Sequence, residues 1–300
     1  MKTEKSKRAR RPVTIARIIH PLPVSEFLSS YFERRPLVIR GQAKKFSHLF
    51  VADDFKFGLD RVTEIRAVFE GLWQATIDPA DIKEMFNAGA SICVTGLERA
   101  HPKLLQTADA IKRELNYAGD VSFRAYLSPP GTGFDLHFDA RVATTLQIGG
   151  SKRWWFSAKP AVEFPDSNSP RDQKTLKREY SMPKLNHLKS VLLRPGDLLC
   201  LPAGTWHRAR AQTMSLALNL AFDHGGAGVF DVLMEALYER LRRDPLWRAP
   251  LPAVANANGF TPEIAAILRE RVESLQRELV EMGNDDAALK RAWVKSVGAR

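Results

Sequence analysis

His137 and Asp139 stand two residues apart in the segment GFDLHFDARV, which we interpret as an extended strand. Residues two apart in a strand project from the same face, so one imidazole and one carboxylate would point together into a barrel interior. Such a pair supplies two ligands of a facial metal site that leaves three further positions open. Because so short a motif often occurs by chance, the pair alone favours a structural hydrogen bond over a metal site.

The segment RPGDLLCLPAGTWH adds a candidate third ligand, His207. A Pro-Gly-Asp turn leads into a buried strand, LLCLP, and an Ala-Gly turn then precedes the histidine. A histidine at the mouth of a barrel strand, just past a glycine turn, has little reason to fill an apolar core. We therefore expect His137, Asp139 and His207 to bind one metal ion, and the other five histidines to be surface or structural residues.

Lys152 and Arg153 follow the Gly149-Gly150 turn, and the hairpin should carry one of them back over the strand that holds the metal ligands. A 2-oxo acid cosubstrate such as 2-oxoglutarate would chelate the metal and need a cation for its distal carboxylate. Lysine suits a single buried carboxylate as a compact charge, and arginine would bind it through two hydrogen bonds. The spacing leaves open which residue does this, or whether both are solvated charges at the hairpin tip.

The elements that must position these residues are short and rich in β-formers. Between residues 121 and 222, runs such as VSFRAYLS, ATTLQI, KRWWFS and SVLLR alternate with glycine and proline turns. This pattern is typical of an all-β sandwich or barrel. Upstream, we expect a helix over residues 24–35 with Ser25 as N-cap, a strand in LVIRG, and a helix over residues 104–116.

Beyond Gly225 the pattern becomes helical. Phe230, Leu233, Met234, Leu237 and Leu241 form one apolar stripe, and a second helix should begin with Thr261 as N-cap and Pro262 at its first position. The stripe of the second helix comprises Ile264, Leu268, Val272, Leu275 and Leu279. Packing of a helix on the β core and dimerisation through helices fit this spacing equally well.

Composition describes an ordinary globular chain of 300 residues, 44% hydrophobic and 26% charged. We expect no membrane partner, because no run of about 18 apolar residues occurs and the N-terminus lacks a secretory apolar stretch. Two cysteines far apart argue against a disulfide scaffold, so a cytoplasmic location is expected. Much of the net charge of +11 lies in residues 1–12, a basic tail that either aids solubility or follows phosphates on RNA. Direct nucleic-acid binding therefore stays open.

Three separated motifs resemble the JmjC-type cupin oxygenases, closest to the ribosomal oxygenase branch. The family shows Tyr-x-Thr-Pro-x-Gly before His-x-Asp, then a Gln-x-x-Gly-x-Lys-x-Trp hairpin, then Pro-Gly-Asp before the distal histidine. The matching residues here are Tyr126, Ser128, Pro129 and Gly131, then Gln147, Gly150, Lys152 and Trp154, then Pro195, Gly196, Asp197, Gly204 and His207. The similarity covers about residues 121–222, with weaker support from PLVIRG at 36–41.

The resemblance implies a mostly β core with α additions, a double-stranded β-helix (cupin/JmjC jelly roll) with a flanking N-terminal α/β segment and C-terminal helices. We expect the basic tail at 1–12, the oxygenase domain at 13–225, and a helical region at 226–300 that could serve dimerisation. That last region is too short for a full winged-helix domain after such helices, and Arg124 stands where the ribosomal branch tends to have a small polar residue.

The resemblance also assigns roles. Fe(II) would be held by His137, Asp139 and His207, and Lys152, rather than Arg153, would anchor the distal carboxylate of 2-oxoglutarate. Tyr126 and Ser128 are candidates to complete that pocket. Asn219 would hydrogen-bond the cosubstrate or orient a ligand, unless it is an ordinary satisfied polar group.

The activity implied is an Fe(II)- and 2-oxoglutarate-dependent oxygenase that hydroxylates a side chain of a protein or peptide, with ribosomal proteins as one substrate class. Two alternatives remain, a hydroxylase of a free amino acid or small metabolite, and a cupin-like binding module without turnover. An intact ligand set together with Lys152 argues against the binding module.

Overall fold

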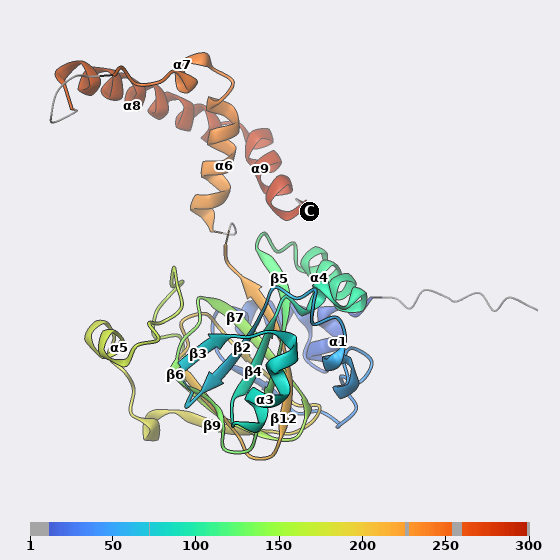
Figure 1. Cartoon of the computed structure of the whole chain (residues 1–300). Helices are drawn as coiled ribbons and strands as arrows, with labels where there is room; N and C mark the ends of the chain where they lie inside the picture. The colour runs from blue at the N-terminus through green and yellow to red at the C-terminus, as the bar shows by residue number, and fades with distance from the viewer. Residues whose placement is uncertain (1–11, 72, 226–227, 254–259, 299–300) are drawn as a thin grey trace, which may run out of the picture. The chain divides into compact units, whose positions relative to one another are not determined.

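The computed structural model describes residues 12–71, 73–225, 228–253 and 260–298, which fall into two compact units (Figure 1). The larger unit comprises residues up to Leu115 together with Asp120–His224, and the smaller unit comprises Asn116–Gly119 and the chain from Gly225. Each unit is described by itself. The predicted basic tail at residues 1–12 lies, apart from Pro12, outside the described residues.

Two antiparallel sheets build the larger unit. The first has the order β1-β10-β7-β12-β5-β4-β2-β3 and the second the order β6-β11-β8-β9. The strands of the first sheet are β1 (Leu37–Ile39), β2 (Glu64–Phe69), β3 (Trp73–Thr76), β4 (Ser91–Thr95), β5 (Asp120–Ser128), β7 (Arg141–Gly149), β10 (Leu198–Leu201) and β12 (Ser215–Asp223). The strands of the second sheet are β6 (Gly133–His137), β8 (Lys152–Phe156), β9 (Lys189–Leu193) and β11 (His207–Ala211). The β-rich pattern predicted for residues 121–222 is therefore confirmed.

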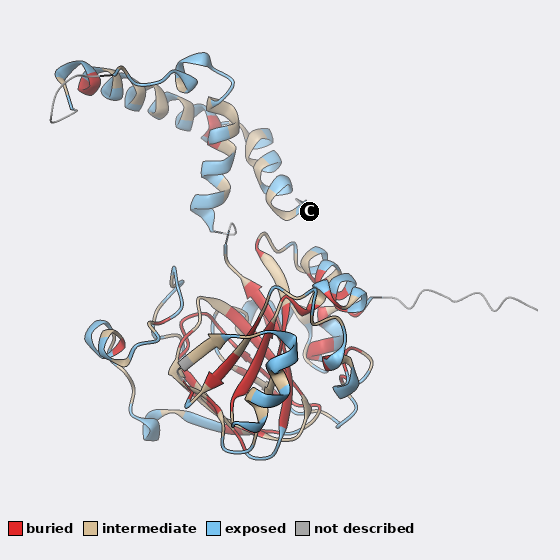
Figure 2. Cartoon of the chain, viewed as in Figure 1, coloured by how far each residue is buried: buried red, intermediate tan, exposed pale blue. Residues whose placement is uncertain are grey.

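The core of this unit lies within the strands, as the red segments of Figure 2 show. Strand β12 is buried over eight of its nine residues and pairs with β5 on one side and with β7 on the other. Its sequence, SLALNLAFD, is accordingly almost continuous in apolar residues. Burying a side chain such as Phe222 stabilises the fold by about 1.5–3 kcal/mol, so this central strand contributes much of the stability that holds the site rigid.

Among the described residues of the larger unit, one helix has 14 residues, and the other four have seven or fewer. These helices are α1 (Ile15–Ile19), α2 (Val24–Ser30), α3 (Ile82–Asn87), α4 (Pro102–Leu115) and α5 (Gln173–Glu179), with 3-10 turns at Ala52–Lys56, Pro79–Asp81, Leu97–Arg99 and Leu185–His187. Helix α4 confirms the helix predicted at 104–116. The prediction for 24–35 is wrong in its end and in its cap, because α2 stops at Ser30 and its N-cap is Pro23 rather than Ser25. Beyond α2 the chain turns, and the ring of Phe32 packs against Phe27 and Phe222.

The smaller unit contains α6 (Val229–Leu241), α7 (Pro245–Arg248), α8 (Pro262–Gly283) and α9 (Asp286–Gly298). The predicted cap of α8 is confirmed, since the Thr261 hydroxyl accepts a hydrogen bond from the Ile264 amide at 3.3 Å. Helix α9 was not predicted. Ion pairs join the helices, with Arg240 of α6 bound to Glu278 and Glu281 of α8.

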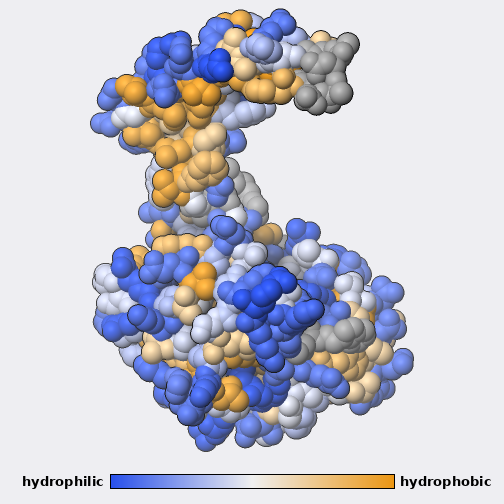
Figure 3. Space-filling model, turned by 90° about the vertical axis from the view of Figure 1, so that its left-hand side faces the viewer, coloured by the Kyte–Doolittle hydropathy of each residue, from blue (hydrophilic) through white to orange (hydrophobic). Residues whose placement is uncertain are grey.

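Most side chains of the two predicted apolar stripes, on α6 and α8, are exposed to solvent within this unit. Leu237 and Ile264 are buried, and Figure 3 shows orange, apolar side chains gathered along one side of the helices. The more exposed stripe residues are Phe230, Leu233, Met234, Leu268, Val272 and Leu279. Among the described residues, no helix is both long enough and apolar enough to cross a membrane, and both cysteines are buried free thiols.

Candidate metal centre and cosubstrate pocket

The three predicted ligands come together at one end of the smaller sheet. His137 ends β6 and His207 begins β11, and these two residues face each other in the register of the paired strands. One ligand atom from each of His137, Asp139 and His207 lies within 4.8 Å of the other two, and the His207 Nε2–Asp139 Oδ2 distance is 3.9 Å. Among the residues described, no other group of three metal-ligating side chains is so arranged.

The prediction that His137 and Asp139 point the same way within one strand is wrong. Strand β6 ends at His137, so Asp139 lies beyond the strand and reaches the site by another path. The chain bends after His137, and the amide of Gly204 donates to the carbonyl oxygen of Asp139 at 2.8 Å. The turn before His207 thus holds the carboxylate-bearing residue directly.

Both histidines have their ring orientation fixed by a backbone carbonyl. The Nδ1 of His137 lies 2.6 Å from the carbonyl oxygen of Asp135, and the Nδ1 of His207 lies 2.8 Å from that of Thr205. A carbonyl oxygen only accepts, so each Nδ1 donates its proton there, which leaves Nε2 as the ring atom that can bind a metal. Second contacts of this kind are typical of metal-binding histidines, because they fix the tautomer and the direction of the lone pair.

The charge states suit a cation. Burial by itself would raise the pKa of Asp139, but Arg141, whose guanidinium lies 3.3 Å away, and the two histidines hold that pKa well below its usual range. Burial and His137 lower the pKa of His207 to about 4, although Asp139 acts in the opposite direction. Near neutral pH the site therefore presents a carboxylate and a neutral imidazole at His207, the forms in which these groups bind a metal.

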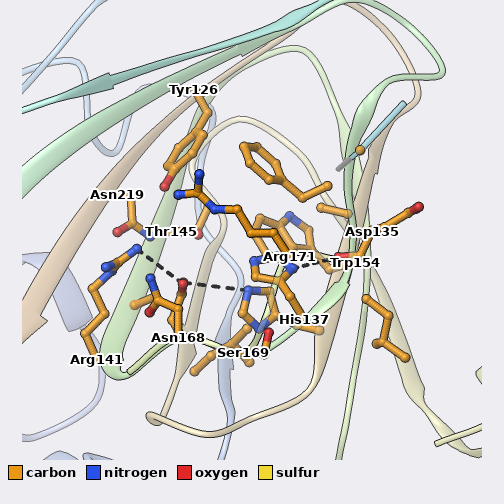
Figure 4. Close-up of a pocket in the computed structure, with 18 of the residues that line it drawn as sticks. Tyr126, Asp135, His137, Arg141, Thr145, Trp154, Asn168, Ser169, Arg171 and Asn219 are labelled. Carbon is orange, nitrogen blue, oxygen red and sulfur yellow. Dashed lines mark hydrogen bonds and ion pairs between the residues drawn. The ribbon is translucent and has the colours of Figure 1, made fainter. Parts of the chain in front are cut away.

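The same residues line the pocket drawn in Figure 4. Its wall also includes Tyr126 of β5, Thr145 of β7, Lys152 and Trp154 of β8, and Asn219 of β12. Every one of these strands runs through the core, so the side chains that line the pocket are held on rigid elements.

Lys152 is the unusual member of this wall. It is only 2% exposed, and its Nζ donates a hydrogen bond of 2.8 Å to the Ser128 hydroxyl, which also accepts one from Ser91. Burial lowers the pKa of Lys152 to about 8. No carboxylate pairs with this ammonium among the described residues. Arg153, the alternative anchor, does not line the pocket. A buried ammonium with a neutral partner is a favourable place for an anion.

The remaining predicted residues divide between the pocket and its support. Tyr126 lines the pocket with its ring edge-on to Phe134, and burial raises the pKa of Tyr126 above its usual range. Asn219 lines it too, and its side-chain amide donates to Thr145 Oγ1 at 3.3 Å. Ser128 is fully buried behind Lys152. Arg124 is not part of the wall and instead pairs with Asp223 at 3.6 Å.

Sequence reasoning missed three arginines of this pocket, Arg66 of β2, Arg141 and Arg171. Arg141, two residues after Asp139, could have been found by the same spacing argument that was applied to His137. Arg171 comes from the loop between β8 and α5, where no regular pattern of residues gives a signal.

Comparisons with known proteins agree with this architecture. Residues 99–226 match the JmjC domain family. The chain is 27% identical to the uncharacterized protein YxbC of Bacillus subtilis (strain 168), over 89% of this chain and 90% of that protein. It is 27% identical to the bifunctional lysine-specific demethylase and histidyl-hydroxylase NO66 of Aedes aegypti, over 64% of this chain and 31% of that protein.

Ribosomal oxygenase 1 of Danio rerio is 21% identical, over 91% of this chain and 53% of that protein, so the chain spans about half or less of these two named oxygenases. Among solved structures, Escherichia coli YcfD, a ribosomal oxygenase, in complex with cobalt and 2-oxoglutarate has a TM-score of 0.58 at 17% identity, covering 92% of this chain and 71% of that chain. The fold expected from the three motifs, a JmjC/cupin core of antiparallel sheets with helices at both ends, is thus confirmed.

Proposed function

We propose that this protein is an Fe(II)- and 2-oxoglutarate-dependent oxygenase. The observation that carries the proposal is the combination, in one pocket, of the His137, Asp139 and His207 ligand atoms with the buried, carboxylate-free ammonium of Lys152. Two nitrogens and one carboxylate fit Fe(II), which accepts both kinds of donor and keeps sites for a chelating cosubstrate.

Fe(II) with bound 2-oxoglutarate would supply the oxidation, in which O₂ converts 2-oxoglutarate to succinate and CO₂ and one oxygen atom enters a C–H bond of the substrate. The protein's residues bind and orient the reactants. Lys152 would hold the distal carboxylate of 2-oxoglutarate, with Ser128 fixing the ammonium. Tyr126 and Asn219 would complete the walls of the pocket, and Trp154 would exclude water beside His207, on which its ring stacks at 5.9 Å.

The substrate we propose is a side chain of a protein or peptide. Support comes from relatives whose names describe a histidyl-hydroxylase and a ribosomal oxygenase, and ribosomal proteins are the first class to test. Hydroxylation of a free amino acid is the alternative, because selectivity depends on details of the pocket that a fold does not fix.

The test is anaerobic titration of the Fe(II)-loaded protein with 2-oxoglutarate, followed by measurement of succinate after air is admitted. We expect Lys152→Ala to abolish measurable binding of 2-oxoglutarate, whereas Lys159→Ala, at an exposed position outside the pocket, should bind like the wild type. Wild-type protein that fails to bind 2-oxoglutarate, or a Lys152→Ala variant that binds it unchanged, would overturn the proposal. Mass spectrometry for a gain of one oxygen atom then separates ribosomal proteins from free amino acids.

We also propose that the helices after Gly225 pair with those of a second copy. The proposal is supported by the exposed apolar residues of α6 and α8, among them Phe230, at 73% exposure, and Val272, at 55%. Sedimentation should show a dimer for the wild type and a monomer for the double variant Phe230→Glu, Val272→Glu. A wild-type monomer at all concentrations would contradict it.

A further inference from the structure

The loop between β8 and α5 is hydrogen-bonded to the residues on both sides of Asp139, Phe138 and Ala140. The amide of Phe138 donates to Ser169 Oγ at 3.1 Å, and the amide of Ser169 donates back to the Phe138 carbonyl oxygen at 3.0 Å. On the other side, the amide of Ala140 donates to Asn168 Oδ1 at 2.8 Å. These three hydrogen bonds fix the loop relative to the candidate metal centre.

Helix α5 fixes the other end of this loop. Leu176 is buried in a cluster with Phe138 and Trp206, two neighbours of the metal ligands. The carboxylate of Asp172 accepts the amide of Thr175 at 2.8 Å and so caps the helix. Arg171 lies between these two anchored points, and its backbone position is therefore well defined.

The side chain of Arg171 is free to bind something else. It lines the same pocket as the metal ligands and extends across it in the close-up view (Figure 4). Its guanidinium has no hydrogen-bond or ion-pair partner anywhere in the described part of the chain, and the residue is exposed. Because an arginine presents up to five N–H donors in a planar fork, an unpaired one aimed into a pocket suits a carboxylate.

The other charged groups of the pocket already have partners. Arg66 pairs with Glu64 at 3.2 Å and donates to Gln74, and Arg141 lies between Asp139 and Asp223. The carboxylate of Asp135 is held by Arg210 and, at 3.9 Å, by Arg208. Lys152 would have the distal carboxylate of 2-oxoglutarate as its counterion. Among the described residues, Arg171 is then the cation of the pocket wall that has neither a carboxylate of the chain nor one of 2-oxoglutarate beside it.

We propose that Arg171 binds a carboxylate of the substrate and makes the enzyme selective for anionic substrates. This inference rests on the proposed function and names the substrate class of that same pocket. The carboxylate can come from an aspartate or glutamate side chain within a peptide, or from the α-carboxyl group of a free amino acid. A substrate with a lysine or arginine side chain at this position is disfavoured by charge repulsion.

The proposal can be tested without turnover. Mn(II) replaces Fe(II) as a paramagnetic divalent probe that accepts the same oxygen and nitrogen ligands. Protein loaded with Mn(II) and 2-oxoglutarate is titrated with blocked tripeptides, acetyl-Gly-Xaa-Gly-amide, in which Xaa is Asp, Asn, Glu, Gln, Arg or Leu. Broadening of the peptide NMR signals by Mn(II) reports binding close to the metal, and free aspartate, glutamate and leucine form the second arm.

We expect broadening by the acidic peptides at concentrations about tenfold below those needed for their amide counterparts, the size expected for one charge-assisted pair. If the α-carboxylate is the recognised group, free leucine broadens as strongly as free aspartate while the blocked peptides do not. Arg171→Ala should remove the preference, and Arg171→Glu should reverse it toward the Arg peptide. Arg178→Ala is the matched control, since Arg178 lies on α5, is 67% exposed and pairs with Glu179 outside the pocket.

Equal broadening by the acidic blocked peptides and their neutral counterparts, no broadening by any compound, or a preference that survives in Arg171→Ala would each overturn the proposal. Binding of 2-oxoglutarate to the Mn(II) protein is measured first. A protein that does not bind 2-oxoglutarate refutes the proposed function, whereas one that binds it without any selectivity for anions refutes only the role of Arg171.

Discussion

The buried ammonium of Lys152 should destabilise the folded protein and also bind the distal carboxylate of 2-oxoglutarate. The substitution Lys152→Met separates these two effects. Burial lowers the pKa of this lysine from 10.5 to about 8, which corresponds to a cost of about 3 kcal/mol in the free energy of unfolding at neutral pH. Methionine is apolar, flexible and of similar length. The variant also loses the hydrogen bond to Ser128, which lowers its free energy of unfolding by about 1 kcal/mol. We therefore expect the variant, free of metal and cosubstrate, to be about 2 kcal/mol more stable.

The gain should depend on pH in a defined direction. Below about pH 8 the lysine is protonated in both the folded and the unfolded chain, so the full cost of burying the charge is present. Between about pH 8 and 10.5 the folded protein loses this proton while the unfolded chain keeps it, and the cost disappears. The stability advantage of Lys152→Met should shrink accordingly as the pH rises through this range.

The assay is urea unfolding of both proteins at about pH 7 and about pH 10, with Lys159→Met, at an exposed position, as the control. In a parallel anaerobic titration, the affinity of Lys152→Met for 2-oxoglutarate should fall at least about tenfold, because the carboxylate loses its counterion. A variant that is less stable at pH 7, a gain that is equal at both pH values, or an unchanged affinity would refute the reasoning.

Three further predictions concern the same pocket. The affinity of the wild type for 2-oxoglutarate should weaken by about tenfold per pH unit above about pH 8, since the ammonium that binds the carboxylate is lost there; titrations across this range check it. Asp139→Asn should weaken Co(II) binding by about 100-fold or more, measured by visible absorption, because the site loses its negative ligand; retained binding would show that Asp139 is not a ligand. Ser169→Ala should lower the free energy of unfolding by about 1–2 kcal/mol, since the buried amide of Phe138 loses its acceptor. Denaturant unfolding measures this change, and an unchanged stability would contradict the prediction.

Much of the fold and the metal centre could be predicted because the residues involved are chemically distinctive. His207 lies far along the chain from His137 and Asp139, but glycine turns mark the ends of the strands that bring the three together. Strand β12 lies in the β-rich region predicted for residues 121–222, and its continuous apolar run reflects burial on both faces.

Other features depend on contacts that leave no local pattern. Strand β11, HRARA, alternates inward and outward residues, yet its inward positions are a histidine and two alanines, too weakly apolar to mark a strand. The position of Asp139 is set by a hydrogen bond from Gly204, a residue 65 positions later. Arg171 enters the pocket because Asn168 and Ser169 bond to the ligand segment, a tertiary contact that no periodicity encodes.

The pairing of His137 with His207 across β6 and β11 makes assembly of the metal site depend on the register of these two strands. A slip of one residue in this register would turn one imidazole to the opposite face of the sheet, and the site would keep only one of its two histidines. A half-folded chain would therefore hold metal poorly, so that metal capture reports completed strand pairing. A redox-active ion would therefore be bound tightly only after these strands have paired and the surrounding sheets enclose it.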